Sequence, residues 1–155
     1  MDTAIPVGAL IGVIASLVGT WAAYRLLVAK EVRQRHAELK DALRLVKIEL
    51  TSQSAVLTSS GADTRVDCTA YEALKARALL ASLPTDLATQ IVRAYLLLAR
   101  MNEARQDRDN TWYGMVAAGR TQDDLSKFND AIRSARSDAE AEVAKCVIAV
   151  SEYLK

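Results

Sequence analysis

Three patterns of apolar and polar residues follow one another along the chain. The first is an unbroken run, in which the twenty residues from Ile5 to Tyr24 carry no charge. The second is a seam of mainly apolar residues whose spacing alternates between four and three, the period of helices packed side by side. The third is a series of amphipathic stretches that reaches the C-terminus. Strand-like alternation is absent, so the patterns predict an all-α protein.

The uncharged run has the length of a membrane-spanning helix. Twenty residues that rise 1.5 Å each cover about 30 Å, the thickness of a hydrocarbon core. Trp21, Tyr24 and Arg25 at its end suit the lipid–water interface. A cleaved signal peptide needs a basic segment before a shorter apolar core, and a buried helix of a soluble protein is usually shorter. We therefore expect a retained anchor over residues 4–24.

The distribution of Lys and Arg predicts the orientation of this anchor. No basic side chain precedes the run, and five follow within sixteen positions: Arg25, Lys30, Arg33, Arg35 and Lys40. The positive-inside rule then places residues 1–3 outside the cell (inner) membrane and residues 25–155 in the cytoplasm. The same basic residues indicate a modest attraction to anionic lipid. A solvated helix face that also sets topology is the simpler explanation.

Small residues recur every four positions within the run: Gly8, Gly12, Ser16 and Thr20. Such a ribbon lets two membrane helices approach closely, and its first two members form a GxxxG motif. Small residues are also frequent in membrane helices in general. We interpret the ribbon as a candidate contact with a second copy or with another membrane protein. The run holds no ionisable residue, which argues against an ion or proton path.

The first helix is expected to continue beyond the membrane as a stalk. No Gly or Pro occurs between Thr20 and Ser60. The stalk seam follows the heptad spacing of a coiled coil and comprises Val32, His36, Leu39, Leu43, Val46 and Leu50. Helices that share such a seam pack along it, so this stalk begins the predicted domain of residues 25–155.

Turn and capping residues divide the remainder into three further helices. Thr69 and Glu72 resemble a capping box at the start of one, and Pro84 is placed to open the next. A similar sequence at Thr121 precedes the last. Short connections favour antiparallel neighbours, so we predict an antiparallel bundle of about four helices, the first contiguous with the membrane span. The expected core includes Leu43, Val46, Leu50, Leu57, Leu74, Ile91, Tyr95, Leu98, Trp112, Leu125, Phe128, Ile132, Val147 and Val150.

A polar stretch from Asn102 to Asn110 interrupts the apolar stripe of the third predicted helix. If the helix continues through it, Arg105 and Arg108 face inward before the stripe resumes at Trp112. We expect a helix with a solvated stretch. A binding surface made by the Arg and Asp residues is the functional alternative.

The composition names no reaction. With 20 basic and 19 acidic residues, the chain has no general attraction for nucleic acid. The single histidine, His36, has no Ser, Cys or Asp partner at a catalytic spacing. Cys68 and Cys146 lie far apart without metal-ligand spacing, although Cys68 falls at a helix start, where a thiol pKa can drop. We therefore expect no catalytic residue, cofactor or metal site, and identify no small-molecule substrate.

These features favour a membrane-anchored, non-catalytic interaction or scaffold module that associates with itself or with another membrane protein. One alternative is a phage-type envelope or lysis subunit, which this chain resembles in layout but not in any motif. In that case the helical domain lies outside the membrane. A second alternative is an enzyme with an unrecognised site. The layout also resembles many uncharacterised bacterial membrane proteins, and this resemblance transfers no activity.

Overall fold

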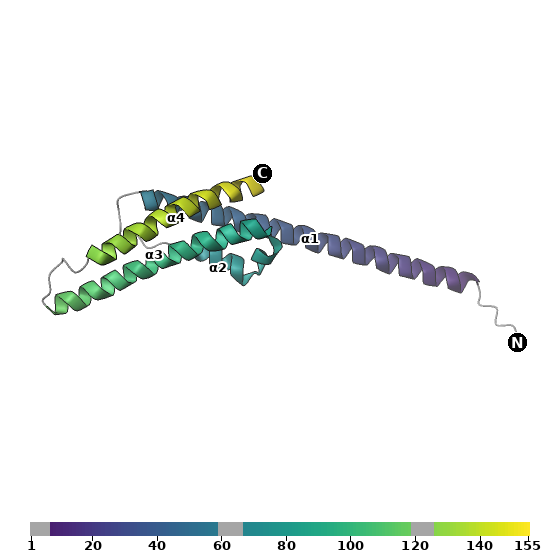
Figure 1. The fold of residues 1–155 in the computed structure, drawn as a ribbon. Coiled ribbons are helices and arrows are strands. Elements are labelled where there is room, and N and C mark those ends of the chain that lie inside the picture. The colour runs from purple at the N-terminus through teal and green to yellow at the C-terminus, as the bar shows by residue number, and fades with distance from the viewer. Residues whose placement is uncertain (1–6, 59–66, 119–125) are drawn as a thin grey trace. The chain divides into compact units, whose positions relative to one another are not determined.

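The structure, a computed structural model, describes residues 7–58, 67–118 and 126–155 (Figure 1). Side chains are described from Gly12 onward in the first range and from Asn129 onward in the last. Every regular element in these ranges is helical, which confirms the all-α class. The elements are α1 (Val7–Thr58), α2 (Thr69–Ala76), the 3-10 helix η1 (Leu79–Ser82), α3 (Thr85–Ala117) and α4 (Ser126–Tyr153).

The chain divides into two units, Met1–Leu39 and Lys40–Lys155, and α1 belongs to both. The first unit ends fifteen residues beyond the predicted end of the membrane span, inside the predicted stalk. In the first unit, every described side chain from Gly12 to Ala37 is exposed. Among the described residues, one helix is long and apolar enough to cross a membrane, and it is α1.

The second unit has a core supplied by all four α-helices. In α1 the buried side chains follow the predicted seam, and α3 packs against α4 (Figure 1). Arg136 of α4 donates hydrogen bonds to the Leu57 carbonyl of α1, one of them from Nε at 2.6 Å. Large side chains with at most 2% exposure are Leu43, Val46, Leu50, Leu57, Leu74, Ile91, Tyr95, Leu98, Met101, Val143, Cys146 and Val150.

Two residues expected in the core are not fully buried, and the side chains of two others lie outside the described residues. Trp112 is 40% exposed, on a part of α3 where the charged residue Arg105 is buried between Met101 and Met115. Val147 is half-buried at the edge of the buried face of α4. The side chains of Leu125 and Phe128 lie outside the described residues.

The predicted capping box of α2 is wrong. Asp67 accepts hydrogen bonds from the backbone N–H (3.1 Å) and hydroxyl (2.5 Å) of Thr69, which holds the pKa of Asp67 below its usual value. Glu72 instead pairs with Lys75 at 3.2 Å. The capping box does not form because the free N–H groups at a helix N-terminus can donate to any well-placed oxygen, and the Thr69 N–H donates to Asp67. The similar sequence at Thr121 lies outside the described residues.

Candidate functional site

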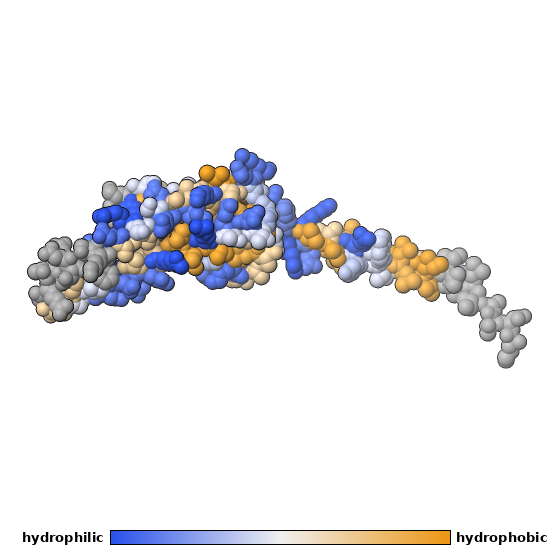
Figure 2. Space-filling model, viewed as in Figure 1, coloured by the Kyte–Doolittle hydropathy of each residue, from blue (hydrophilic) through white to orange (hydrophobic). Residues whose placement is uncertain are grey.

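The first candidate site is the exposed apolar part of α1. Its large apolar side chains are not covered by any described part of the chain, and Figure 2 shows the aliphatic ones among them as orange patches on α1. They include Val13, Ile14, Leu17, Val18, Trp21, Tyr24, Leu26 and Leu27. An apolar surface of this extent is typical of a membrane or protein interaction site rather than of a surface that faces water.

The small-residue ribbon lies on this exposed part. Gly8 is in α1, although only its backbone is described, and Gly12, Ser16 and Thr20 are exposed. A methyl group built on Gly12 or Gly19 meets no described atom within 4 Å. The Thr20 hydroxyl donates to the Ser16 carbonyl at 2.8 Å, so its donor is satisfied inside the helix. The helix surface is therefore open for a close approach and compatible with lipid.

The predicted interface residues lie at the end of the apolar band. The Arg25 guanidinium carbon is 4.8 Å from the centre of the Trp21 ring, a cation–π contact between residues four apart. Trp21 and Tyr24 are both exposed. Farther along α1 than Arg25, the Arg35 side chain pairs with Glu31 at 3.0 Å. Aromatic and cationic side chains thus lie together where the sequence predicts the lipid–water boundary.

The stalk seam is divided between the two units of the chain. Val32 is 61% exposed, and His36 is also exposed. The other four members, Leu39, Leu43, Val46 and Leu50, are at most 3% exposed. The latter part of the seam is therefore covered by the chain itself, whereas contacts for Val32 and His36 stay a prediction.

Glu49, one residue before the last seam position, joins three helices. Its Oε1 accepts a hydrogen bond from the Tyr95 hydroxyl of α3 at 2.6 Å, and its Oε2 accepts one from the Ala70 N–H of α2 at 2.8 Å. The Tyr71 ring stacks on Tyr95 with ring centres 4.7 Å apart. Burial, followed by the Glu49 contact, raises the pKa of Tyr95. No spacing in the sequence predicts this cluster, because Ala70 and Tyr95 lie 21 and 46 residues from Glu49.

Neither cysteine is in a setting that activates a thiol. Burial, followed by the nearby carboxylates of Glu49, Asp67 and Glu72, raises the pKa of Cys68. Burial and Glu142 raise the pKa of Cys146 to about 12. A thiolate is the reactive form, so both sulfur atoms are held as neutral thiols. A position at a helix start can lower the pKa of a thiol, but the pKa of Cys68 is raised.

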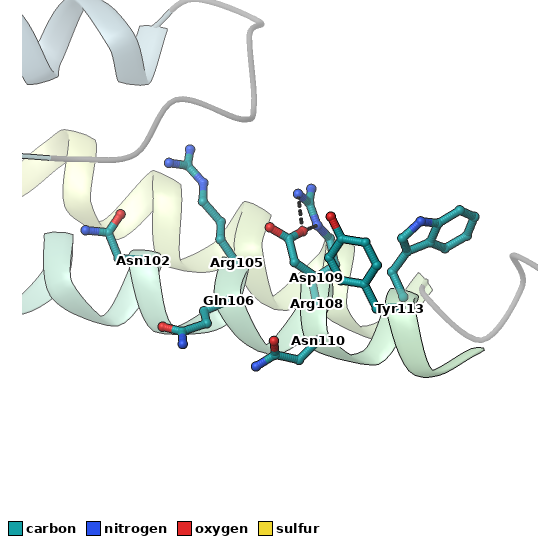
Figure 3. Close-up of a pocket in the computed structure, with 8 residues that line it drawn as sticks. Asn102, Arg105, Gln106, Arg108, Asp109, Asn110 and Tyr113 are labelled. Carbon is teal, nitrogen blue, oxygen red and sulfur yellow. Dashed lines mark hydrogen bonds and ion pairs between the residues drawn. The ribbon is translucent and has the colours of Figure 1, made fainter. Parts of the chain in front are cut away.

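The polar stretch of residues 102–110 lies on α3 and lines a hollow of about 500 Å³ (Figure 3). Helix continuity through this stretch is confirmed. Arg105 points inward and is 8% exposed. Arg108 donates from Nε and Nη2 to Asp109 Oδ1, at 2.9 and 2.8 Å. The lining residues, all from this one helix, are Asn102, Arg105, Gln106, Arg108, Asp109, Asn110, Trp112 and Tyr113.

This hollow is lined by polar side chains and by the two aromatic rings of Trp112 and Tyr113. Across the residues that the structure describes, no group of three or more His, Cys, Asp or Glu side chains could hold a metal ion. His36, the one histidine, lies on the exposed part of α1, in the other unit of the chain.

Comparison with known proteins adds no family to this picture. No protein-family model matches the chain, and neither a curated protein nor a solved structure matches it. The functional conclusion therefore rests on the residues described above.

Proposed function

We propose that this chain is a single-pass membrane protein whose helical domain is a non-catalytic interaction module. The observation that carries the proposal is the exposed apolar part of α1, whose large apolar side chains from Val13 to Leu27 are left uncovered by the described chain. Each apolar Å² left in water costs roughly 25 cal/mol, so such a segment is stable only where lipid or protein covers it.

The domain attached to this anchor is proposed to be an antiparallel bundle. Three observations support that arrangement: the packing of α3 against α4, the hydrogen bonds of Glu49 to α2 and α3, and those of Arg136 to α1. Four helices that share one apolar core and short connections favour antiparallel neighbours. A rigid domain of this kind presents side chains to a partner without performing chemistry.

Self-association through α1 is the proposed mode of interaction. Gly12 is exposed with open space above its Cα atom, and Ser16 and Thr20 follow at helical spacing. Small side chains let two helix backbones come close enough for van der Waals packing in lipid. Anchoring both copies in one bilayer also raises their effective concentration.

Energy transfer between labelled full-length copies in lipid vesicles tests this mode. We expect transfer above that of random mixing, and Gly12→Leu should weaken association roughly tenfold, equivalent to about 1.4 kcal/mol. Val18→Leu adds bulk about 120° away on the same helix and should leave transfer unchanged. Equal transfer for the wild type and Gly12→Leu would defeat self-association through this face.

The proposed orientation places residues 1–3 outside the inner membrane and the helical domain in the cytoplasm. This orientation is supported by the basic residues that follow the span, since no Lys or Arg precedes it. A reporter fused after Lys155, active on only one side of the membrane, tests this orientation. Activity outside the cytoplasm would overturn it and favour the phage-type envelope layout.

A further inference from the structure

The part of α1 that follows the apolar band carries its charges unevenly around the helix. Arg25, Lys30 and Arg33 lie within an arc of about 140°, since successive residues turn by about 100°. On the remaining arc, Glu31 is paired with Arg35 at 3.0 Å, and Glu38 accepts a hydrogen bond from Gln34 at 3.0 Å. One side of the helix is therefore basic, and the other is close to neutral.

The three cations of this basic face (Arg25, Lys30 and Arg33) are available for an external anion. All three are exposed, and none of them forms an ion pair with a carboxylate within the described part of the chain. Arg25 lies over the Trp21 ring at 4.8 Å, which holds its planar guanidinium beside the aromatic residue. A guanidinium fork in this position matches the geometry of a phosphate group.

The spacing along the helix matches the depth of a charged membrane surface. If Arg25 lies at headgroup level, Lys30 and Arg33 lie about 7 and 12 Å farther along the axis. The screening length at physiological ionic strength is about 8 Å, so Lys30 lies within the potential of an anionic surface, and the long Arg33 side chain can reach back toward that surface from just beyond it. Arg25 can bind the phosphate of any phospholipid, whereas Lys30 and Arg33 respond to net negative charge.

We propose that the basic face of α1 recruits anionic phospholipids around the end of the membrane span. The proposal rests on the proposed insertion of α1 into a bilayer and adds the chemical class of lipid that surrounds it. One basic side chain near an anionic surface corresponds to about a fivefold preference. The partner is the lipid headgroup, with a phosphate near Arg25 and net negative charge near Lys30 and Arg33.

The test uses the fluorescence of Trp21 in full-length protein that carries Trp112→Phe, since the chain has two tryptophans. The protein is reconstituted into vesicles of phosphatidylglycerol and phosphatidylcholine in equal amounts, with bromine on the acyl chains of one lipid or the other. Bromine quenches a nearby indole. We expect both brominated lipids to quench, and brominated phosphatidylglycerol to be enriched at least threefold beside Trp21 at low salt.

Two double variants that remove the same charge test whether the basic face causes the lipid preference. Lys30→Gln with Arg33→Gln should remove most of the preference, whereas Arg77→Gln with Arg100→Gln removes the same charge from the helical domain and should leave it intact. Equal quenching by both lipids would overturn the lipid preference but not insertion. Quenching by neither would overturn insertion itself. A preference that survives Lys30→Gln with Arg33→Gln would refute its assignment to the basic face.

Discussion

Leu17 and Leu50 lie on the same helix, yet Leu17 is 65% exposed and Leu50 is fully buried. Around Leu50, apolar residues recur every third or fourth position, and charged residues such as Arg44 and Lys47 lie between them. Around Leu17, apolar and small residues occupy every side of the helix. The backbone is helical in both places, so helix formation does not explain the difference.

The difference concerns what covers the side chains. In the latter part of α1, the other helices of the chain bury one face and leave the charged face to water. In the earlier part the chain covers no face, and no polar face exists for water to solvate. A helix that is apolar all round is stable in an apolar surrounding, which here must come from outside the described chain.

The largest expected effect comes from the covered part. Leu50→Ala should lower the free energy of unfolding of the helical domain by about 2–5 kcal/mol, because it leaves a cavity in a packed core. Leu45→Ala, at an exposed position five residues earlier, should change it by less than about 0.5 kcal/mol. Urea unfolding of the full chain in detergent, followed by circular dichroism, measures both. Similar losses of stability for the two variants would contradict the difference in packing between the buried and the exposed leucine.

The uncovered part should respond to charge instead. Leu17→Arg places a cation near the middle of the proposed span and should disfavour insertion by about 3 kcal/mol. The matched change Leu45→Arg alters another exposed leucine, which we expect to face water, and it should leave insertion unchanged. Flotation with lipid vesicles on a density gradient measures the inserted fraction. Normal flotation of Leu17→Arg would argue against a membrane environment at this position.

Polar contacts that hold the latter part of α1 to its neighbours should have a smaller effect. Tyr95→Phe removes the hydroxyl that donates to Glu49 at 2.6 Å and leaves a half-buried carboxylate oxygen without that donor. The expected loss of stability is about 1–2 kcal/mol. Tyr113→Phe changes an exposed tyrosine and serves as the control. Equal unfolding midpoints in urea for the two variants would show that the Glu49 contact contributes little.

The smallest effect is a dependence on alkaline pH. Burial raises the pKa of Cys146 from 9.0 to about 12, so the folded chain retains a proton that the unfolded chain loses. Stability is therefore complete below pH 9 and falls as the pH rises toward 12. At pH 10 the loss is about 1.4 kcal/mol. Cys146→Ala lacks this titration, so its stability should decline less between pH 8 and pH 10 in urea titrations. Equal declines in stability for the wild type and Cys146→Ala would show that Cys146 does not cause the pH dependence.

Much of α1 could be predicted from the sequence because its determinants are local. A stretch without Gly or Pro gives a long helix, and the four-three spacing identifies Leu39, Leu43, Val46 and Leu50 as one face. The inward position of Arg105 on α3 follows from the same periodicity. Periodicity states which side chains share a face, and here that was enough to find most of the core.

The failures have two origins: one is contacts between segments far apart in the chain, and the other is the local surroundings of single residues. Glu49 accepts the Ala70 N–H from 21 residues away, and no local spacing signals that pairing. The capping box at Thr69 failed because Asp67 competes for the same donors. Trp112 has the right period for the core but is 40% exposed, since helical spacing alone does not guarantee burial.

Extraction of cell membranes with alkaline carbonate most directly tests whether the exposed apolar part of α1 lies in lipid. After cells that express the full chain are broken without detergent, we predict that the protein sediments with the membranes, resists carbonate and is released by detergent. Recovery of the intact chain in the soluble fraction would contradict the account, because its apolar helix would then be covered by something other than a bilayer.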